Sequence, residues 1–320
     1  MALKYDPEYE AAIAPFKDQQ RPVFENVHKL REFHQNLLGT VFRMAPVPQT
    51  VQEKQFFTKS TLDGAKVPIH RFATNDVLAH PAPQPAVLYL HGGGFVSGSV
   101  DMYRPVVMRN ANASGCVLFA VEYRLAPEHP APAGVEDCFS GLVYLIEHAK
   151  ELNIDPKRIC IMGDSGGGGM AVGVALMARD RGVTPKVAKL LLIYPMLDDR
   201  TIIPEDSPLR PFLTWQPRDN VLAWTALLGE EKAGDPEADV SYYVAPARAP
   251  SLAGLPPTYV DVGGLDLLKE EIIIFAARLV QEHIEVEMHL WPGVPHGFEN
   301  YGTSWTARAA GSRLKALKTY

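Results

Sequence analysis

Cysteine is scarce in this chain of 320 residues, and its scarcity argues against two kinds of small scaffold. The three cysteines, Cys116, Cys138 and Cys160, lie far apart in apolar segments and form no C-x-x-C pair. Disulfide frameworks and zinc sites need more numerous or more closely spaced cysteines. We therefore expect three buried free thiols in a reducing compartment, and neither a metal nor another cofactor.

Long apolar runs and clusters of basic residues are also missing. No uninterrupted apolar run approaches the roughly 18 residues that signal a membrane-spanning helix, and the first residues carry no apolar signal segment. The net charge is −6 without a Lys/Arg cluster, which argues against nucleic acid or an anionic membrane as partner. The sequence predicts a cytoplasmic protein without membrane insertion that binds a small molecule. Its oligomeric state, including a homodimer, is left open.

What the chain does contain is a regular alternation of strand-like and helix-like segments, with 47% apolar residues to build a core. Strands are predicted at 86–90, 116–122, 158–162, 188–194, 257–262 and 285–291. Helices are predicted near 101–114, 132–151, 167–181 and 267–283. Such alternation is typical of an α/β protein with a mostly parallel sheet and helices on both faces.

Two regions depart from this rhythm. Residues 1–45 have apolar residues at helical spacing, and the alternation that follows them predicts an antiparallel hairpin at a sheet edge. Residues 196–244 are rich in Pro and Asp and too long for a simple crossover, so we expect an insertion over the carboxyl edge of the sheet. The predicted organisation is one sheet domain, 46–195 and 245–320, with a cap made from 1–45 and 196–244.

Two glycine-rich segments each follow a predicted strand. The second, Gly163-Asp164-Ser165-Gly166-Gly167, opens a helix and matches the G-x-S-x-G turn, which exposes a serine above the sheet. Glycines flank such a serine because larger side chains would collide with the neighbouring strand or helix. The first, His91-Gly92-Gly93-Gly94, matches the loop that offers backbone N–H groups to an oxyanion. Together they predict a serine hydrolase with Ser165 as nucleophile.

Other uses of these glycines fit less well. The run 166–169 resembles a phosphate-binding loop, but no Lys-Ser/Thr follows it. A dinucleotide site needs an acidic residue at the end of a second strand, and none stands at the expected distance. We expect the N–H groups of Gly93, Gly94 and Gly166 to bind the oxyanion, with Gly92 as a substitute for one of them.

The serine needs a base, and three histidines follow it in the chain. His283 ends a predicted helix and His289 alternates within a predicted strand, so both are expected to face solvent or to be structural. His296 lies in a loop after the last strand, where an imidazole is able to reach the serine. We predict that His296 is the base.

The orienting acid has two candidates. Asp261 lies within a predicted strand, whereas Asp266 follows that strand at its carboxyl end, beside the other two groups. Asp266 is preferred for this reason, and its position also suits a helix N-cap. The chain order Ser165, Asp266, His296 is that of α/β-hydrolases.

Residues 85–300 resemble the bacterial-type hormone-sensitive lipase family of α/β-hydrolases. The resemblance implies a carboxylic ester hydrolase with an eight-stranded sheet, a helical cap and a preference for short acyl chains. The segments that carry it are His91-Gly92-Gly93-Gly94-Phe95 with Gly98-Ser99, Glu122-Tyr123-Arg124-Leu125-Ala126-Pro127-Glu128, Gly163-Asp164-Ser165-Gly166-Gly167, Asp266 with Leu268 and Glu271, and His296-Gly297-Phe298.

The chain departs from this family at two positions. Many members have Ala after the nucleophile where this chain has Gly166, from which we expect a looser turn. The usual Pro after the acid is Leu267 here, which weakens the assignment of Asp266. The segment 122–128 is expected to support the HGGG loop through buried charge pairs.

The predicted activity is hydrolysis of short-chain carboxylic esters through an acyl-serine intermediate. An amidase or formamidase with the same triad is the alternative, and a binding protein on this fold is disfavoured because the triad residues are all present. A lipase is disfavoured by the charged cap sequence. The acyl pocket is expected to be lined by residues among Phe95, Tyr194, Met196, Phe212, Trp215 and Val294, each of which suits ordinary core equally well.

Overall fold

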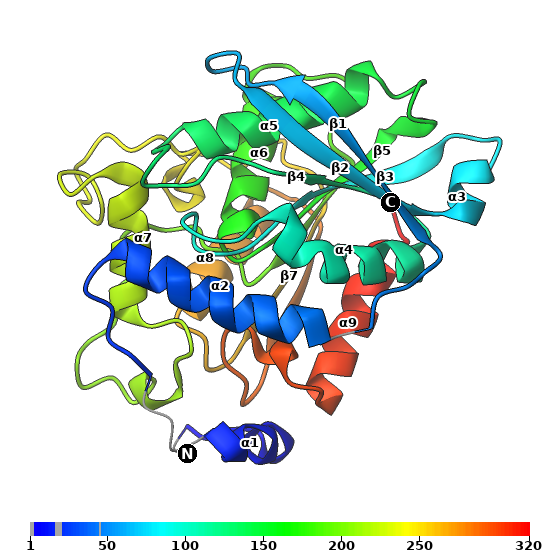
Figure 1. The fold of residues 1–320 in the computed structure, drawn as a ribbon. Helices are drawn as coiled ribbons and strands as arrows, with labels where there is room; N and C mark the ends of the chain where they lie inside the picture. Colours follow the sequence, from blue (N-terminus) through cyan, green and yellow to red (C-terminus); the bar gives the residue numbers. More distant parts are fainter. Residues whose placement is uncertain (1–2, 17–20, 45) are drawn as a thin grey trace.

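An eight-stranded sheet runs through the centre of the molecule, with strand order β1-β2-β4-β3-β5-β6-β7-β8 (Figure 1). The computed structural model describes residues 3–16, 21–44 and 46–320. Strands β1 and β2 pair antiparallel with each other, β2 is antiparallel to β4, and the remaining pairs are parallel. The strands are β1 Val51–Lys59, β2 Lys66–Thr74, β3 Gln84–Leu90, β4 Val117–Val121, β5 Ile154–Asp164, β6 Lys189–Ile193, β7 Thr258–Gly263 and β8 Val286–Trp291. The predicted eight-stranded, mostly parallel sheet and its edge hairpin are confirmed.

The central strands are apolar because both of their faces are covered. Every residue of β4, β6 and β7 is buried, whereas β1 at one edge is mostly exposed and β8 at the other edge has only one fully buried residue. Continuous apolar runs are typical of parallel strands between two helical layers. This core fixes the carboxyl ends of β3, β5, β6 and β7 side by side, where the predicted site residues lie.

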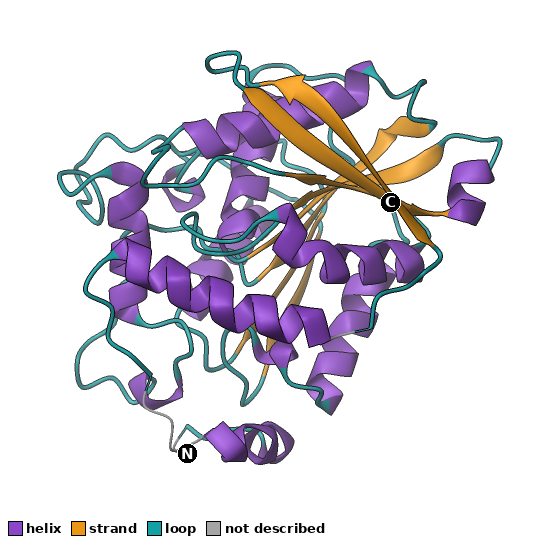
Figure 2. Ribbon diagram, in the orientation of Figure 1, coloured by secondary structure: helices purple, strands orange, loops and turns teal. Residues whose placement is uncertain are grey.

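Helices cover both faces of the sheet (Figure 2). On one face α5 packs against α6, and on the other α4 contacts α9. The helices are α1 Pro7–Ile13, α2 Val27–Met44, α3 Asn75–Ala79, α4 Val100–Ser114, α5 Ala133–Glu147, α6 Gly166–Asp180, α7 Pro217–Leu228, α8 Lys269–Gln281 and α9 Ser304–Ala316, with short 3₁₀ turns at Ala14–Phe16, Arg210–Phe212, Pro246–Arg248 and Phe298–Asn300. The short helix α3 was not predicted, and β5 begins earlier than expected.

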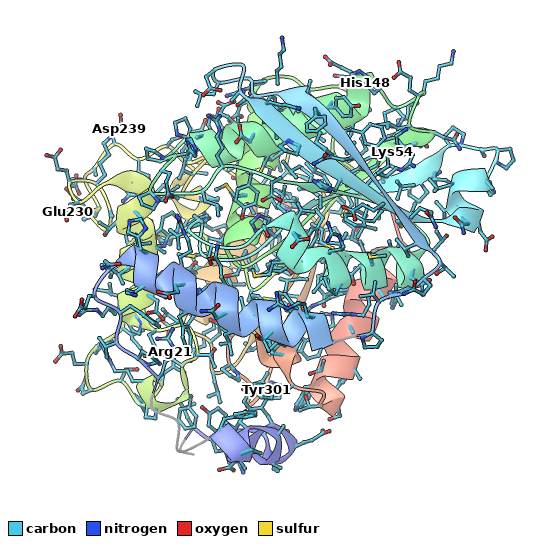
Figure 3. All side chains as sticks on the ribbon, viewed as in Figure 1. Arg21, Lys54, His148, Glu230, Asp239 and Tyr301 are labelled. Carbon is cyan, nitrogen blue, oxygen red and sulfur yellow. The ribbon has the colours of Figure 1, made fainter. Side chains whose placement is uncertain are left out.

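The two segments assigned to a cap come together in space. Helix α2 lies beside α4 and contacts α7, the main helix of the insertion (Figure 1). The outer side of the insertion carries exposed charged side chains such as Glu230 and Asp239 (Figure 3). Residues 1–2, 17–20 and 45 of the predicted N-terminal segment lie outside the described residues.

Two further features bear on the composition. Cys116, Cys138 and Cys160 are buried and unpaired. Within 3–16, 21–44 and 46–320, no helix combines the length and apolarity needed to cross a bilayer.

Candidate active site

The nucleophile elbow, residues 163–167, joins β5 to α6 in a strained backbone conformation that depends on glycines on both sides of the serine. Ser165 has φ 54° and ψ −117°, outside the regions that L-residues normally adopt. A Cβ on Gly163 would lie 2.1 Å from the carbonyl oxygen of Gly167, and a Cβ on Gly167 would lie 2.1 Å from that of Leu90. Both flanking positions therefore require glycine, and the serine hydroxyl is held above the ends of the strands.

Ser165, His296 and Asp266 form a connected row of hydrogen bonds. The Nε2 atom of His296 is 2.9 Å from Ser165 Oγ, and its Nδ1 is 2.7 Å from Asp266 Oδ2. The other carboxylate oxygen, Oδ1, accepts a hydrogen bond from the backbone N–H of Leu268 at 2.9 Å. Asp266 is fully buried, and its hydrogen bond to Nδ1 fixes the orientation of the His296 ring. The structure thus brings together the three side chains singled out in the sequence.

Asp261 serves another purpose. Its carboxylate makes a two-pronged ion pair with Arg313 of α9, at 2.7 and 2.9 Å, and accepts a hydrogen bond from the Tyr259 hydroxyl. Its side chain is completely buried in the sheet. Asp261 therefore ties α9 to β7 and is not part of the triad geometry.

The oxyanion loop, residues 91–95, lies directly over the elbow. Gly93 and Gly94 have φ values of 123° and 58°, which favour glycine. In the part of the chain that the structure describes, the backbone N–H groups of Gly93, Gly94 and Gly166 donate to no protein acceptor. Gly166 is the first residue of α6, so its amide is also at the positive end of the helix dipole. These three donors are free to bind a developing negative charge.

Comparison with known proteins places this geometry in a family. The model of the alpha/beta hydrolase fold family matches residues 87–300. Esterase LipI of Mycobacterium tuberculosis is 36% identical over 69% of this chain and 67% of its own length. Carboxylesterase NlhH of the same organism is 35% identical over 73% of each chain. A bacterial heroin esterase structure superposes with a TM-score of 0.87 at 34% identity, covering 98% of this chain and 97% of that one.

The chain belongs to the carboxylesterases of the hormone-sensitive lipase family. The resemblance drawn from the sequence motifs is confirmed.

In this esterase the position after the nucleophile is tight, not loose. A Cβ on Gly166 would lie 2.9 Å from the backbone N of Phe95 and 3.1 Å from that of Gly94. The oxyanion loop occupies the space that an alanine methyl would need. The expectation of a looser turn at Gly166 was therefore wrong.

Support for the oxyanion loop comes mainly from hydrogen bonds to its backbone. Arg31 of α2 donates to the carbonyl oxygens of Val96 and Ala126, at 2.5 and 2.6 Å, and Ala126 N–H donates to the Phe95 carbonyl at 3.1 Å. Glu122 accepts from the N–H of Val100 at the start of α4. Segment 122–128 also contributes, because Glu128 pairs with Arg31 at 2.6 Å and the Tyr123 hydroxyl donates to the His91 carbonyl at 2.6 Å. The expected charge pair is therefore present, but it is partly exposed and acts through Arg31. Arg31 was missed because nothing in an amphipathic helix marks one arginine for this task.

The imidazole of His296 is packed as well as hydrogen-bonded. The ring of Tyr194 lies 4.3 Å from the ring of His296, and its hydroxyl donates to Glu299 Oε1 at 2.6 Å. Burial alone would raise the pKa of Glu299, but Arg313 and the Tyr194 hydroxyl hold it below its usual value. Thr214, from the insertion, donates to the backbone carbonyl of His296 at 2.6 Å. The position of His296 is thus fixed by a ring contact with Tyr194 and by the hydrogen bond from Thr214 to its backbone.

Asp164, next to the nucleophile, is a buried carboxylate that the sequence analysis left aside. Burial raises its pKa to about 7, against the opposing effect of a 2.7 Å hydrogen bond from the Tyr89 hydroxyl. Its side chain lines a cavity of about 590 Å³ between α2, α4 and α9, together with Arg109, Glu299 and Arg313.

The predicted pocket residues separate into two groups. The ring of Trp215 lies 6.5 Å from His296 and reaches within 2.8 Å of where a Cβ on Gly94 would stand. Tyr194 and Phe95 also border the triad and the elbow. Phe212 packs instead against Tyr5, and Val294 and Met196 are fully buried in core clusters.

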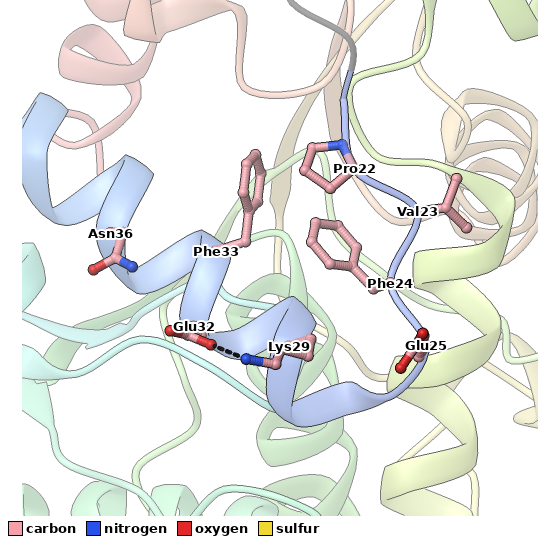
Figure 4. A pocket seen from close by; sticks show the side chains of 8 residues that line it. All are labelled: Pro22, Val23, Phe24, Glu25, Lys29, Glu32, Phe33 and Asn36. Atoms are coloured by element: carbon pink, nitrogen blue, oxygen red, sulfur yellow. Dashed lines mark hydrogen bonds and ion pairs between the residues drawn. The ribbon is translucent and has the colours of Figure 1, made fainter.

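A second hollow lies on the outer side of α2 and does not contain a triad residue. It measures about 470 Å³ and lies between α2 and the segment 22–25 that precedes it (Figure 4). The rings of Phe24 and Phe33 lie next to each other in its wall, with centroids 5.1 Å apart, and Lys29 pairs with Glu32 at its edge.

Proposed function

We propose that this carboxylesterase hydrolyses short-chain carboxylic esters through an acyl-serine intermediate, with Ser165 as nucleophile, His296 as base and Asp266 as the orienting acid. The observation that carries the assignment is the row of two hydrogen bonds, 2.9 Å from Ser165 to His296 and 2.7 Å from His296 to Asp266. Free amides of Gly93, Gly94 and Gly166 beside the serine supply the oxyanion donors.

In the first half-reaction His296 takes the proton of Ser165 as the hydroxyl oxygen attacks the ester carbonyl. Asp266 keeps Nδ1 protonated before the attack and stabilises the imidazolium that forms. The three amides bind the oxyanion of the tetrahedral intermediate. The intermediate collapses as His296 protonates the leaving alcohol.

The second half-reaction reverses these roles with water. His296 removes a proton from the water as it attacks the acyl-serine carbonyl, and the same amides stabilise the second oxyanion. Collapse returns the proton from His296 to Ser165 and releases the carboxylic acid. No group outside the triad and the oxyanion loop is needed for either half.

The preference for short chains is supported by the aromatic rings around the site. Trp215 from the insertion lies over the oxyanion loop, and Tyr194 lies against the base. We infer that α1, α2 and residues 196–244 act as a cap over the triad, because Trp215, Thr214 and Arg31 all reach the site from these segments. Such a cover leaves limited room for a long acyl chain.

We also propose a homodimer formed through the β8 edge of the sheet. Leu290 of β8 and Ile274 and Val280 of α8 are 49%, 61% and 59% exposed and lie on the same edge of the molecule. An unpaired edge strand flanked by apolar side chains is suited to pairing with a second copy. Sedimentation equilibrium of the wild type and of Leu290→Lys tests this; a monomer in the wild type would contradict it.

A cytoplasmic location is the last part of the proposal. The three buried, unpaired thiols fit a reducing compartment. Fractionation of the native cells, followed by an immunoblot for the protein, provides the test. Recovery of the chain outside the cell would contradict this location.

The test of the activity is a series of initial rates on p-nitrophenyl esters from acetate to palmitate, for the wild type and Ser165→Ala. We expect a rate that depends on Ser165, falls by about a million-fold on its loss, and peaks at short chains. A paired p-nitroanilide series separates an esterase from an amidase. A Ser165→Ala protein that kept a tenth of the activity would rule out this mechanism.

A further inference from the structure

His34 of α2 lies on the face of that helix that points to the site. It follows Leu30, which is fully buried, by one helical turn, so the two side chains share a face. Arg31, one residue after Leu30, fixes the helix to the backbone of the oxyanion loop through Val96 and to Ala126. The position of His34 relative to the site is therefore set by the same contacts that hold the oxyanion loop.

The nearest aromatic neighbour of His34 across the site is Trp215. Their rings lie 5.5 Å apart, and the indole N–H of Trp215 is already donated to Asn220 Oδ1 at 3.1 Å. Trp215 itself is next to Gly94 and 6.5 Å from His296. His34 thus stands across Trp215 from the oxyanion loop and the base.

Neither ring nitrogen of His34 has a hydrogen-bond partner among the residues described in the structure, and Nδ1 is completely buried. Buried polar atoms in folded proteins are nearly always hydrogen-bonded, so the imidazole of His34 is left open to a partner from outside the protein, water or a substrate group. Burial first, and then the nearby charges of Arg21 and His296, lower the pKa of His34 to about 3. Its ring is neutral and offers one donor and one acceptor.

We propose that His34 is a specificity-determining residue that hydrogen-bonds an uncharged polar group, a hydroxyl or a carbonyl, on the ester substrate. The preferred substrates are then small esters with a neutral polar substituent near the scissile bond, in place of plain alkyl esters. The neutral imidazole carries no charge that would attract a carboxylate, and it offers no counter-charge to a cationic substituent. This inference rests on the proposed esterase function and adds the substrate class to it.

The test uses two pairs of esters that differ by a methyl group and a hydroxyl group of similar size. 2-Hydroxyethyl acetate is compared with propyl acetate for the alcohol side, and ethyl 3-hydroxybutyrate with ethyl 3-methylbutyrate for the acyl side. The kcat/KM ratio within each pair is measured for the wild type, His34→Phe and His34→Gln. Comparison between variants cancels the intrinsic reactivity of each ester.

We expect His34→Phe to lower the polar-to-apolar ratio of at least one pair by about tenfold, as for the loss of one hydrogen bond in a partly enclosed site. His34→Gln retains a donor and an acceptor and should keep more of the ratio than His34→Phe. The matched control is His28→Phe, an exposed histidine on the same helix, which should leave both ratios unchanged.

Ratios within twofold of the wild type in His34→Phe, for both pairs, would overturn the role of His34 while leaving the esterase function intact. Absence of Ser165-dependent hydrolysis of all four esters would instead contradict the proposed function. Calorimetric binding of 2-hydroxyethyl acetate and propyl acetate to Ser165→Ala, with and without His34→Phe, then decides the role of His34 without turnover. The same comparison is made with ethyl 3-hydroxybutyrate and ethyl 3-methylbutyrate. A polar-to-apolar affinity ratio that is equal in the two Ser165→Ala proteins for both pairs would overturn it.

Discussion

The elbow and the proposed cap are built by different kinds of contact. Around Ser165 the chain packs backbone against backbone: a Cβ on Gly169 would lie 2.1 Å from the Met196 carbonyl oxygen, and one on Gly167 equally close to that of Leu90. The two ends of the insertion share this backbone packing, because Met196 and Tyr243 lie against Gly169 and Gly173. Between these ends, side chains add much of the support, such as the ion pair of Asp199 with Arg248 and the contact of Trp215 with His34. The difference indicates that the chemistry is fixed by the main chain, whereas the substrate-facing surface is free to vary one side chain at a time.

The largest expected effect distinguishes two buried aspartates, Asp266 beside His296 and Asp261 beside Arg313. Asp266→Asn should lower kcat by about 10⁴-fold with little loss of stability, because the imidazole loses the partner that sets its tautomer. Asp261→Asn should do the reverse, since it weakens only the tie to Arg313. Turnover of p-nitrophenyl butyrate and thermal unfolding of both variants provide the measurement. A similar loss of kcat in the two variants would remove the distinction between them.

Next in size is the ion pair that anchors the insertion. Arg248→Ala leaves the fully buried Asp199 without its cation, and we expect unfolding in urea to require about 3–5 kcal/mol less free energy. Catalysis on a small ester should change far less than stability. Arg200→Ala is the matched control, because its pair with Asp198 is partly exposed and should contribute less than about 1 kcal/mol. Equal destabilisation by the two variants would contradict the prediction.

A smaller effect should appear in the dependence of stability on pH. The pKa of Asp164 rises from its ordinary 3.8 to about 7 through burial, so the folded state holds this proton more tightly than the unfolded chain. The stabilisation is complete below the ordinary value and is lost as the pH rises through the folded value. The Asp164→Asn variant has no carboxyl group to ionise at this position, so it does not lose this stability as the pH rises. Glu271, whose pKa is raised to about 8, contributes equally to both proteins.

The measurement is the melting temperature of the wild type and Asp164→Asn between about pH 4 and pH 8. We expect the difference to grow in favour of the variant as the pH rises, because only the wild type has to bury a charge at this position. A difference that stays constant across the range would show that Asp164 does not titrate with folding.

The smallest expected effect concerns Gly166, where the elbow packs against the oxyanion loop. Gly166→Ala places a methyl group 2.9 Å from the Phe95 nitrogen, so the loop has to move by a few tenths of an ångström. Misplaced oxyanion donors should lower kcat by about tenfold, less than the loss of a donor. Gly311→Ala, whose added methyl would meet nothing within 4 Å, is the control. An unchanged kcat in Gly166→Ala would show that the loop has room to adapt.

Much of the sheet and of the candidate site was predictable because the signals are local in the chain. The nucleophile elbow and the oxyanion loop each need glycines at fixed positions next to a strand, and the strands themselves are continuous apolar runs. Asp266 was separable from Asp261 because parallel strands align their carboxyl ends. By contrast, Arg31, His34 and the Asp164 cavity depend on partners more than sixty residues away or on burial, which leave no local pattern.

The predicted pocket residues show the same limit of what a local sequence pattern reveals. Tyr194 and Trp215 do border the triad, yet Phe212 faces Tyr5 and Val294 lies in a separate core cluster. An aromatic or apolar residue has the same sequence signature whether it lines a pocket or fills a core. Only its neighbours in space distinguish the two.

The sequence by itself determined the order of the strands and helices along the chain, the turn that presents Ser165, and the choice of Asp266 and His296 as the candidate acid and base. Those features depend on backbone sterics and on hydrophobic periodicity, which act over a few residues. Tertiary structure alone decided that Arg31 holds the oxyanion loop, that Gly166 is filled by that loop, and that His34 is left without a partner beside Trp215. These outcomes depend on distances between segments remote in the chain, and only the packing of α2 and the insertion onto the sheet sets those distances.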